Sequence, residues 1–97
     1  MKVRFLSPAN VELDEAISFY DHELPGLGFR FFQEVNSAIN RICLFPEGWA
    51  KIGKRTRRCR LKSFPYAVFY FIDKNEIIVL AVANLHRNPK RYKDRIK

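Results

Sequence analysis

The sequence predicts an α+β domain in which an N-terminal helical hairpin packs on one face of a small antiparallel sheet. Two apolar runs, residues 66–72 and 77–83, are rich in β-branched and aromatic side chains, and four turn-forming residues separate them, as is typical of a β-hairpin. Two amphipathic segments in the first half of the chain predict the helices. A chain of 97 residues has room for one core, so residues 1–97 are expected to form a single domain. The expected order is β-α-α-β-β-β followed by a basic C-terminal tail.

The first strand is expected at residues 2–6, where polar and apolar side chains alternate. Ser7 then fits a helix N-cap, and Pro8 fits the first helical position, where its missing N–H costs nothing. A helix of about residues 9–23 follows and ends at Pro25-Gly26. Its apolar stripe consists of Leu13, Ala16, Ile17, Tyr20 and Leu24.

The second helix has a clearer apolar stripe, which stops before Phe45-Pro46. The connection between the two helices is short, so we expect them to form an antiparallel hairpin. The apolar stripes of this helical hairpin must be buried against a sheet, and the strands expected after Trp49 supply one. The residues at helical spacing in the second stripe are Phe31, Phe32, Val35, Ala38, Ile39 and Ile42.

A basic strand precedes the β-hairpin, and its side chains alternate. Because strand side chains have a period of two, Arg58, Arg60 and Lys62 should share one face. Cys59 and Leu61 should lie on the other. The two apolar runs after it do not alternate, so the hairpin should sit in the middle of the sheet with both faces covered.

Charge is distributed unevenly along the chain. Residues 1–50 carry four Lys or Arg against seven Asp or Glu, whereas residues 51–97 carry fourteen against three. A potential this one-sided favours a polyanion such as nucleic acid, or an acidic protein segment, as a partner. The alternative is that the charge serves solubility alone.

Several classes of function are disfavoured. Gly26-Leu27-Gly28 follows a helix and lacks a third glycine, so it is not a dinucleotide fingerprint. Cys43 and Cys59 have no metal-binding spacing with His22 or His86, and they are interpreted as reduced packing residues. We expect neither a metal nor another cofactor. The absence of a long apolar run or a secretory leader predicts a cytoplasmic protein without a membrane partner.

The residues best suited to chemistry form a cationic group. Arg58, Arg60 and Lys62 share a strand face, and if that strand pairs with the hairpin, His86 and Tyr92 emerge near it. Arginines can hold phosphate oxygens, a tyrosine can stack on an unpaired base, and a histidine can move a proton near neutral pH. These residue types could together promote attack of an RNA 2′-hydroxyl on its neighbouring phosphate without a metal.

Each of these residues also has a structural interpretation. The basic row of Arg58, Arg60 and Lys62 could be the solvated side of an edge strand, where cations discourage aggregation. His86 could cap the end of a strand, and Tyr92 could anchor the tail to the core.

Most of the chain resembles toxins of the RelE/ParE superfamily from bacterial type II toxin–antitoxin systems. The resemblance rests on the order of short motifs in a small chain, and it implies two N-terminal helices packed on a small antiparallel sheet. The matching segments are Pro25-Gly26-Leu27-Gly28-Phe29, Phe45-Pro46-Glu47-Gly48-Trp49, residues 58–70, residues 78–83, and His86-Arg87-Asn88-Pro89 with Tyr92 and Arg95.

The resemblance implies two kinds of activity. RelE-like members cut messenger RNA in the ribosomal A site, and ParE-like members poison DNA gyrase. For RNA cleavage the implied catalytic residues are Arg58, Arg60, His86 and Tyr92. The substrate-binding candidates are Arg57, Lys62, Arg87, Lys90 and Arg91.

This sequence departs from RelE at Ala67, where RelE has an arginine that contacts the scissile phosphate; Arg57 or Arg87 could take its place. Both kinds of toxin are neutralised by an antitoxin whose C-terminal segment wraps the toxin, and an acidic segment would suit this basic chain. The basic row with His86 and Tyr92 places ribosome-dependent endoribonuclease activity ahead of gyrase poisoning. A non-catalytic nucleic-acid or protein-binding module is the third hypothesis.

Overall fold

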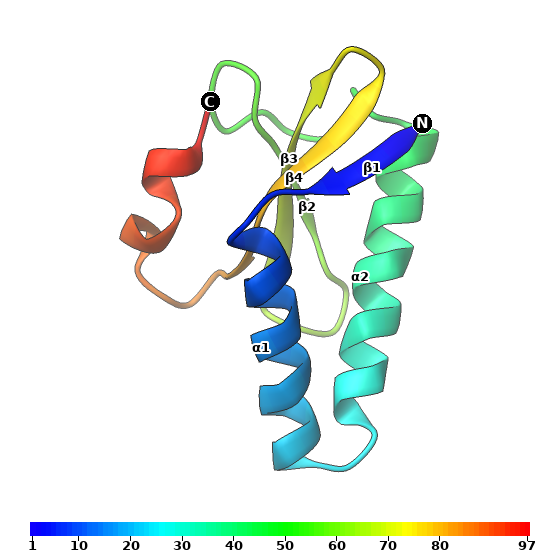
Figure 1. Cartoon of the computed structure of the whole chain (residues 1–97), viewed down its shortest axis with the longest axis vertical. Helices are drawn as coiled ribbons and strands as arrows, with labels where there is room; N and C mark the ends of the chain where they lie inside the picture. The colour runs from blue at the N-terminus through cyan, green and yellow to red at the C-terminus, as the bar shows by residue number, and fades with distance from the viewer.

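Two helices stand against a four-stranded sheet, and a short tail lies on the side of the sheet away from α2 (Figure 1). The computed structural model describes residues 1–97. The order is β-α-α-β-β-β, so the predicted α+β fold class is confirmed. The elements are β1 (Lys2–Phe5), α1 (Ala9–Glu23), α2 (Leu27–Leu44), β2 (Arg57–Arg60), β3 (Tyr66–Asp73), β4 (Glu76–Asn84) and two 3₁₀ turns, Pro89–Arg91 and Lys93–Arg95.

The sheet is mixed rather than wholly antiparallel. Its strand order is β1-β4-β3-β2, and β1 runs parallel to β4 while the other neighbours are antiparallel. The expectation of an antiparallel sheet is therefore corrected at β1. The physical reason is that the chain leaves β1 into the helical hairpin and returns through β2 and β3 before it reaches β4, so no tight turn sets the direction of the β1–β4 pair.

Both faces of the central hairpin are buried, as its non-alternating apolar runs predict. On the helix side, Val68, Tyr70 and Val79 pack with α1 and α2 in the larger core. On the opposite side, Phe69 and Leu80 belong to a second cluster. The partly buried residues that cover this second cluster are Leu6, Ile52, Leu85 and Tyr92.

The start of α1 differs from the prediction. Pro8, not Ser7, occupies the N-cap position, and no side chain caps the helix there. The N–H of Asn10 instead donates to the Leu6 carbonyl, and that of Glu12 donates to the Pro8 carbonyl. The Leu6 carbonyl thus satisfies one donor that a serine cap would otherwise serve, and the bond from Glu12 to Pro8 is the first regular bond of the helix. The predicted span of residues 9–23 is confirmed.

The two helices pack against each other at Gly28, which is buried. A Cβ at this position would overlap the Ile17 carbonyl oxygen and lie 2.8 Å from the Asp21 Cβ. Gly28→Ala is therefore expected to lower the free energy of unfolding by about 1–3 kcal/mol, because the helices must separate to admit a methyl group. Chemical denaturation measures the effect. The matched control is Ser37→Ala on the exposed side of the same helix, which should change stability by less than about 0.5 kcal/mol. Equal effects would show that the helices can separate at no cost.

The basic strand is shorter than predicted. β2 ends at Arg60, and the Leu61 N–H donates to the Tyr66 carbonyl at 2.9 Å in the connection to β3. The N–H groups of Lys62 and Ser63 both donate to Glu34 Oε1, at 3.1 and 2.9 Å. The carboxylate from α2 holds this connection as a turn, so Lys62 lies outside the strand.

Candidate functional site

Two of the three arginines of β2, Arg58 and Arg60, face away from the helices. Arg58 is opposite Phe69 on β3, and Arg60 is opposite Ala67. Residues directly opposite each other in an antiparallel pair share a face, and Phe69 and Ala67 belong to the cluster on the side without helices. We call this side the open face. Cys59 lies on the helix side and is buried, so the alternation predicted for this strand is confirmed.

Arg58 and Arg60 remain available to a partner. Arg58 is half-buried and Arg60 is exposed. Neither takes part in any of the four ion pairs of the structure. Two cations without carboxylate partners on one sheet face can attract phosphate groups or acidic side chains.

Arg57 points to the other side of the sheet. It lies opposite Tyr70, and its Nη1 donates to the carbonyls of Glu47 and Trp49 at 3.0 and 2.8 Å. These bonds hold the loop that leaves α2 against β2. The structure therefore separates Arg57 from Arg58 and Arg60.

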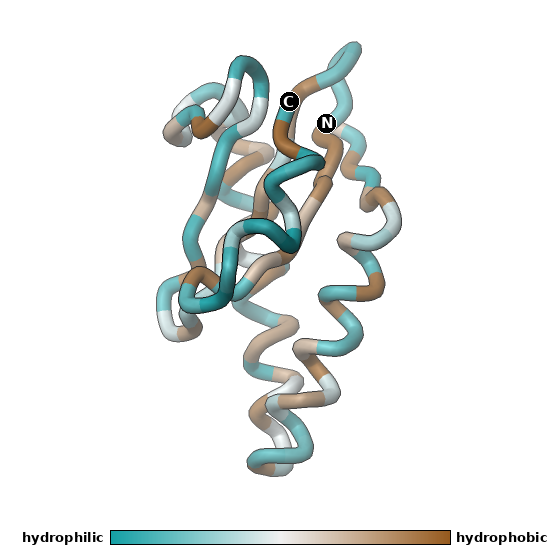
Figure 2. Tube along the Cα trace, turned by 90° about the vertical axis from the view of Figure 1, so that its left-hand side faces the viewer, coloured by the Kyte–Doolittle hydropathy of each residue, from teal (hydrophilic) through white to brown (hydrophobic).

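The tail folds back over the sheet. The Tyr92 ring packs on Phe69, with 4.6 Å between ring centroids, and so lies on the same face as Arg58. The tail, residues 85–97, is mostly hydrophilic and runs in front of the more hydrophobic strands (Figure 2).

His86 sits in the turn after β4 and is exposed. The backbone N–H of His86 donates to Asn84 Oδ1 at 2.8 Å, while the backbone N–H of Leu85 donates to the Pro65 carbonyl at 2.7 Å. These bonds put His86 at the end of the sheet where β3 begins, which is also the end nearest Arg60. No hydrogen bond joins His86 to Arg58 or Arg60. Lys90 and Arg91 lie in the first 3₁₀ turn and are exposed.

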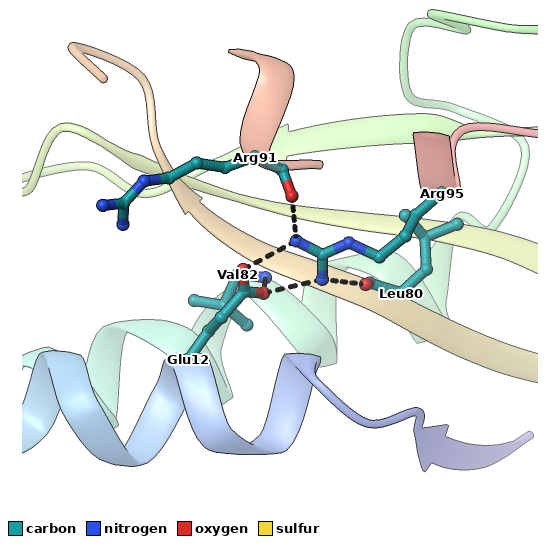
Figure 3. Close-up of polar contacts among 5 residues, drawn as sticks. All are labelled: Glu12, Leu80, Val82, Arg91 and Arg95. Atoms are coloured by element: carbon teal, nitrogen blue, oxygen red, sulfur yellow. Dashed lines mark hydrogen bonds and ion pairs between the residues drawn. The ribbon is translucent and has the colours of Figure 1, made fainter. Parts of the chain in front are cut away.

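Glu12 and Arg95 form a contact that the sequence analysis missed (Figure 3). The Arg95 guanidinium donates to Glu12 Oε1 and Oε2 at 3.1 and 2.8 Å, and to the carbonyls of Leu80 and Arg91 at 2.9 and 3.0 Å. The Val82 N–H also donates to Glu12 Oε1, at 3.1 Å. The two side chains are 23% and 21% exposed. We call this ion pair the tail latch.

The tail latch covers an otherwise open strand edge. β1 ends opposite Val79, so β4 has no neighbouring strand on that side from Leu80 onward. Leu80 also has no partner on β3, because the register shifts there. A bare edge of this kind would expose backbone donors and acceptors to other chains. The side chains of Glu12 and Arg95 satisfy the Leu80 carbonyl and the Val82 N–H instead.

A second anchor holds the end of the tail. The buried Thr56 hydroxyl donates to the Lys97 carbonyl at 3.0 Å and accepts the Lys97 N–H at 2.8 Å. The backbone N–H groups of Arg55 and Thr56 donate to the same carbonyl. The tail is thus fixed at both the β4 edge and the loop before β2.

A cleft of about 250 Å³ lies between α1 and the tail. One wall is α1, the other is the tail, and the ends of β3 and β4 form its floor. We call it the α1–tail cleft. Its lining residues are Glu12, Glu15, Ala16, Phe19, Tyr66, Val82, Ala83, Asn84, Arg87, Asn88, Arg91 and Tyr92.

Tyr70 anchors the exit from α2. Its hydroxyl donates to the Pro46 carbonyl at 2.6 Å, and burial raises its pKa from 10.0 to about 12, a shift that the nearby Arg57 partly opposes. The folded state therefore holds this proton more tightly than the unfolded chain does. The resulting stabilisation is complete below pH 10 and should be lost as the pH rises toward 12.

Tyr70→Phe tests this assignment. The variant should lose about 0.5–1.5 kcal/mol at neutral pH through the missing hydrogen bond. Between pH 10 and 12 its unfolding free energy should fall less steeply than that of the native protein. Denaturation curves across this pH range measure both effects. Parallel curves would mean that Tyr70 does not titrate as described.

A family model described as the ParE toxin of type II toxin-antitoxin system, parDE, matches residues 3–89. This chain belongs to the ParE toxin family. The match spans 87 of the 97 residues, and it implies an antitoxin as partner of the toxin. Among curated proteins no sequence matches.

A solved structure shows the same fold. The chain is similar to one from the "Chromosomal ParDE TA system from P. aeruginosa", with a TM-score of 0.77 and 16% sequence identity. The alignment covers 89% of the toxin described here and 97% of the other chain. No helix of the toxin combines the length and apolarity needed to cross a bilayer, and no three His, Cys, Asp or Glu side chains cluster closely enough to hold a metal ion.

Proposed function

We propose that this toxin arrests growth by poisoning DNA gyrase and that a cognate antitoxin holds it inactive. The observation that carries the proposal is the ParE family match, which extends over both helices and all of β2, β3 and β4. ParE-like members of the superfamily are the gyrase poisons. The cations of the open face, Arg58 and Arg60, suit a target assembled on DNA, because they can contact backbone phosphates near the enzyme.

Two features of the open face support gyrase over RNA cleavage. Ala67 is fully buried at the position where RelE presents an arginine to the scissile phosphate. The Tyr92 ring is engaged with Phe69, which favours the anchoring interpretation of Tyr92 over base stacking.

Ribosome-dependent cleavage of messenger RNA is the second candidate. It is favoured by the position of His86 at the end of the sheet nearest Arg60. In that mechanism His86 would move the proton of the 2′-hydroxyl or of the leaving oxygen, and Arg58 and Arg60 would stabilise the charge that develops on the phosphate. Lys62, Lys90 and Arg91 would bind the RNA backbone.

Pulse labelling after induced expression separates the two targets. For a gyrase poison, DNA synthesis should fall before protein synthesis, and purified toxin should inhibit supercoiling by gyrase and cause cleaved DNA to accumulate. If protein synthesis fails first and messenger RNA is cut, the target is the ribosome and the gyrase proposal is wrong. Normal growth after induction would contradict both targets and would favour the third hypothesis, a non-catalytic binding module.

His86→Ala provides an independent comparison. Arrest by RNA cleavage should be lost in this variant, whereas gyrase poisoning should persist. Lys54→Ala, which also removes an exposed basic side chain, is the matched control and should arrest growth as the native toxin does.

A further inference from the structure

The α1–tail cleft has the size of a site for one small ligand. Its volume of about 250 Å³ lies just below the roughly 300–1,000 Å³ of sites that enclose a drug-sized molecule. It is separate from the cations of the open face, because neither Arg58 nor Arg60 lines it. The cleft therefore has room for one planar ring system with a short polar extension.

The tail wall of the cleft carries two arginines without a carboxylate partner. Arg87 and Arg91 are exposed and take part in none of the four ion pairs. On the α1 wall Arg95 already binds Glu12, so Glu15 is the one carboxylate of the cleft without a basic partner. Guanidinium groups bind phosphate oxygens through paired hydrogen bonds, so the tail wall suits a phosphate and the side near Glu15 does not.

The tail latch holds the two walls of the cleft together. The Arg95 guanidinium binds Glu12 on α1 and donates to the Arg91 carbonyl on the tail at 3.0 Å. A ligand would therefore meet a tail wall that is already positioned, and less ordering of the protein would oppose its binding.

Aromatic side chains line the cleft from two elements. Phe19 on α1 is 48% exposed, and the one ring it contacts is that of Tyr20, edge-on with 5.1 Å between the ring centroids. Tyr66 lines the cleft at the start of β3. A base that stacks on an aromatic side chain gains about 1–3 kcal/mol, so this surface suits a nucleobase.

Two asparagine side chains of the cleft have a fixed hydrogen-bonding direction. Asn84 Oδ1 accepts the backbone N–H of His86 at 2.8 Å, and Asn88 Oδ1 accepts that of Lys90 at 3.0 Å. The oxygens are thus engaged, and the Nδ2 groups remain as donors without a partner in the protein. Such donors match a base edge that presents acceptors, as guanine does with N7 and O6.

We propose that the α1–tail cleft binds one nucleotide unit. Its base packs against the aromatic side chains, acceptor atoms of the base meet the two asparagine amides, and its phosphate lies on the two arginines. A free mononucleotide and an unpaired nucleotide within a strand both supply this chemistry. The inference goes beyond the proposed function and does not depend on the target of the toxin, because it rests only on residues that line the cleft and on the tail latch.

Chemical-shift mapping of the isotope-labelled native toxin tests the proposal. The probe is guanosine monophosphate, which should bind saturably with a dissociation constant of roughly 0.1–1 mM, since stacking and charge-assisted hydrogen bonds must offset the cost of association. The side-chain amide signals of Asn84 and Asn88 should shift during the titration. Guanosine, which lacks the phosphate, should bind at least about tenfold more weakly.

Two variants separate the contacts of the phosphate from those of the base. Arg87→Gln/Arg91→Gln should weaken binding of guanosine monophosphate by at least about tenfold and leave the affinity for guanosine within about threefold of the native value. Phe19→Ala should weaken binding of both ligands by at least about fivefold, because the base loses a stacking surface.

Matched controls remove the same groups outside the cleft. Lys51→Gln/Lys54→Gln removes two exposed positive charges, and Phe29→Ala removes an exposed ring. Both should bind guanosine monophosphate within about twofold of the native affinity. If the lysine control loses as much affinity as the arginine double variant, the attraction depends on overall charge and the cleft assignment is wrong. The assignment is equally wrong if millimolar guanosine monophosphate causes no saturable shift in the cleft.

A short single-stranded oligonucleotide, with one guanosine flanked by thymidines, identifies the source of the nucleotide. If it binds the native toxin at least about tenfold more tightly than the mononucleotide and Phe19→Ala removes this advantage, the ligand is a strand. Equal or weaker binding identifies a free nucleotide. Circular dichroism establishes that each variant is folded. If the arginine double variant does not fold, Phe19→Ala decides, and native affinity in that variant would overturn the nucleotide site.

Discussion

Phe31→Ala is expected to lower the free energy of unfolding by about 3–5 kcal/mol. Phe31 on α2 is 0% exposed and lies at the centre of an aromatic cluster. Its ring centroid is 5.3 Å from that of Tyr20 on α1, 5.1 Å from that of Phe64 and 4.9 Å from that of Tyr66 on β3. Truncation would remove a ring that joins both helices to the sheet and would leave a cavity that rigid neighbours cannot close.

The matched control for Phe31 lies two residues earlier on the same helix. Phe29 is 62% exposed. Phe29→Ala therefore deletes a phenyl ring that lies mostly in solvent, and it should cost less than about 0.5 kcal/mol of unfolding free energy. Denaturant unfolding of both variants, followed by circular dichroism, gives the comparison. Similar losses for the two variants would contradict the central place assigned to Phe31.

Glu12→Ala should cost about 2–3 kcal/mol, because it leaves the Arg95 guanidinium without its carboxylate partner and the Val82 N–H without its acceptor. Arg95→Ala should have a similar cost through the unpaired Glu12 carboxylate and Leu80 carbonyl. The double variant should lose less than the two single losses together, since both remove the same ion pair. Amide hydrogen exchange at Val82 should quicken in either single variant.

Lys2→Ala is the control for these losses. Lys2 also pairs with a glutamate, Glu76, but at 3.9 Å and with 77% of its side chain exposed. Its removal should change the unfolding free energy by less than about 0.5 kcal/mol. Strict additivity of Glu12→Ala and Arg95→Ala would show that the tail latch contributes nothing as a pair.

Patterns within one element predicted most of the fold. The spacing of apolar residues gave α1 its observed bounds, and the alternation in β2 correctly put Cys59 inside and Arg58 outside. Such patterns reflect the period of a helix or a strand, so residues close together in the sequence are enough to reveal them. They cannot show which strand β1 will join, because that choice depends on where the helical hairpin sends the chain.

The candidate site was only partly predictable for the same reason. That Arg58 and Arg60 share a face followed from strand geometry. The different orientation of Arg57 depends on the Glu47 and Trp49 carbonyls in a loop without regular structure. The partners of the tail latch are 83 residues apart, and no local pattern marks Glu12 among the acidic residues of α1.

Charge is segregated between the elements of the molecule. Residues 1–50, which include both helices, have a net negative charge, whereas the strands and tail of residues 51–97 carry the excess of cations. A negatively charged target or antitoxin would rotate the toxin during diffusional encounter so that its basic side leads. Added salt should therefore slow association far more than it hastens dissociation, and the toxin would find its partners fastest at low ionic strength.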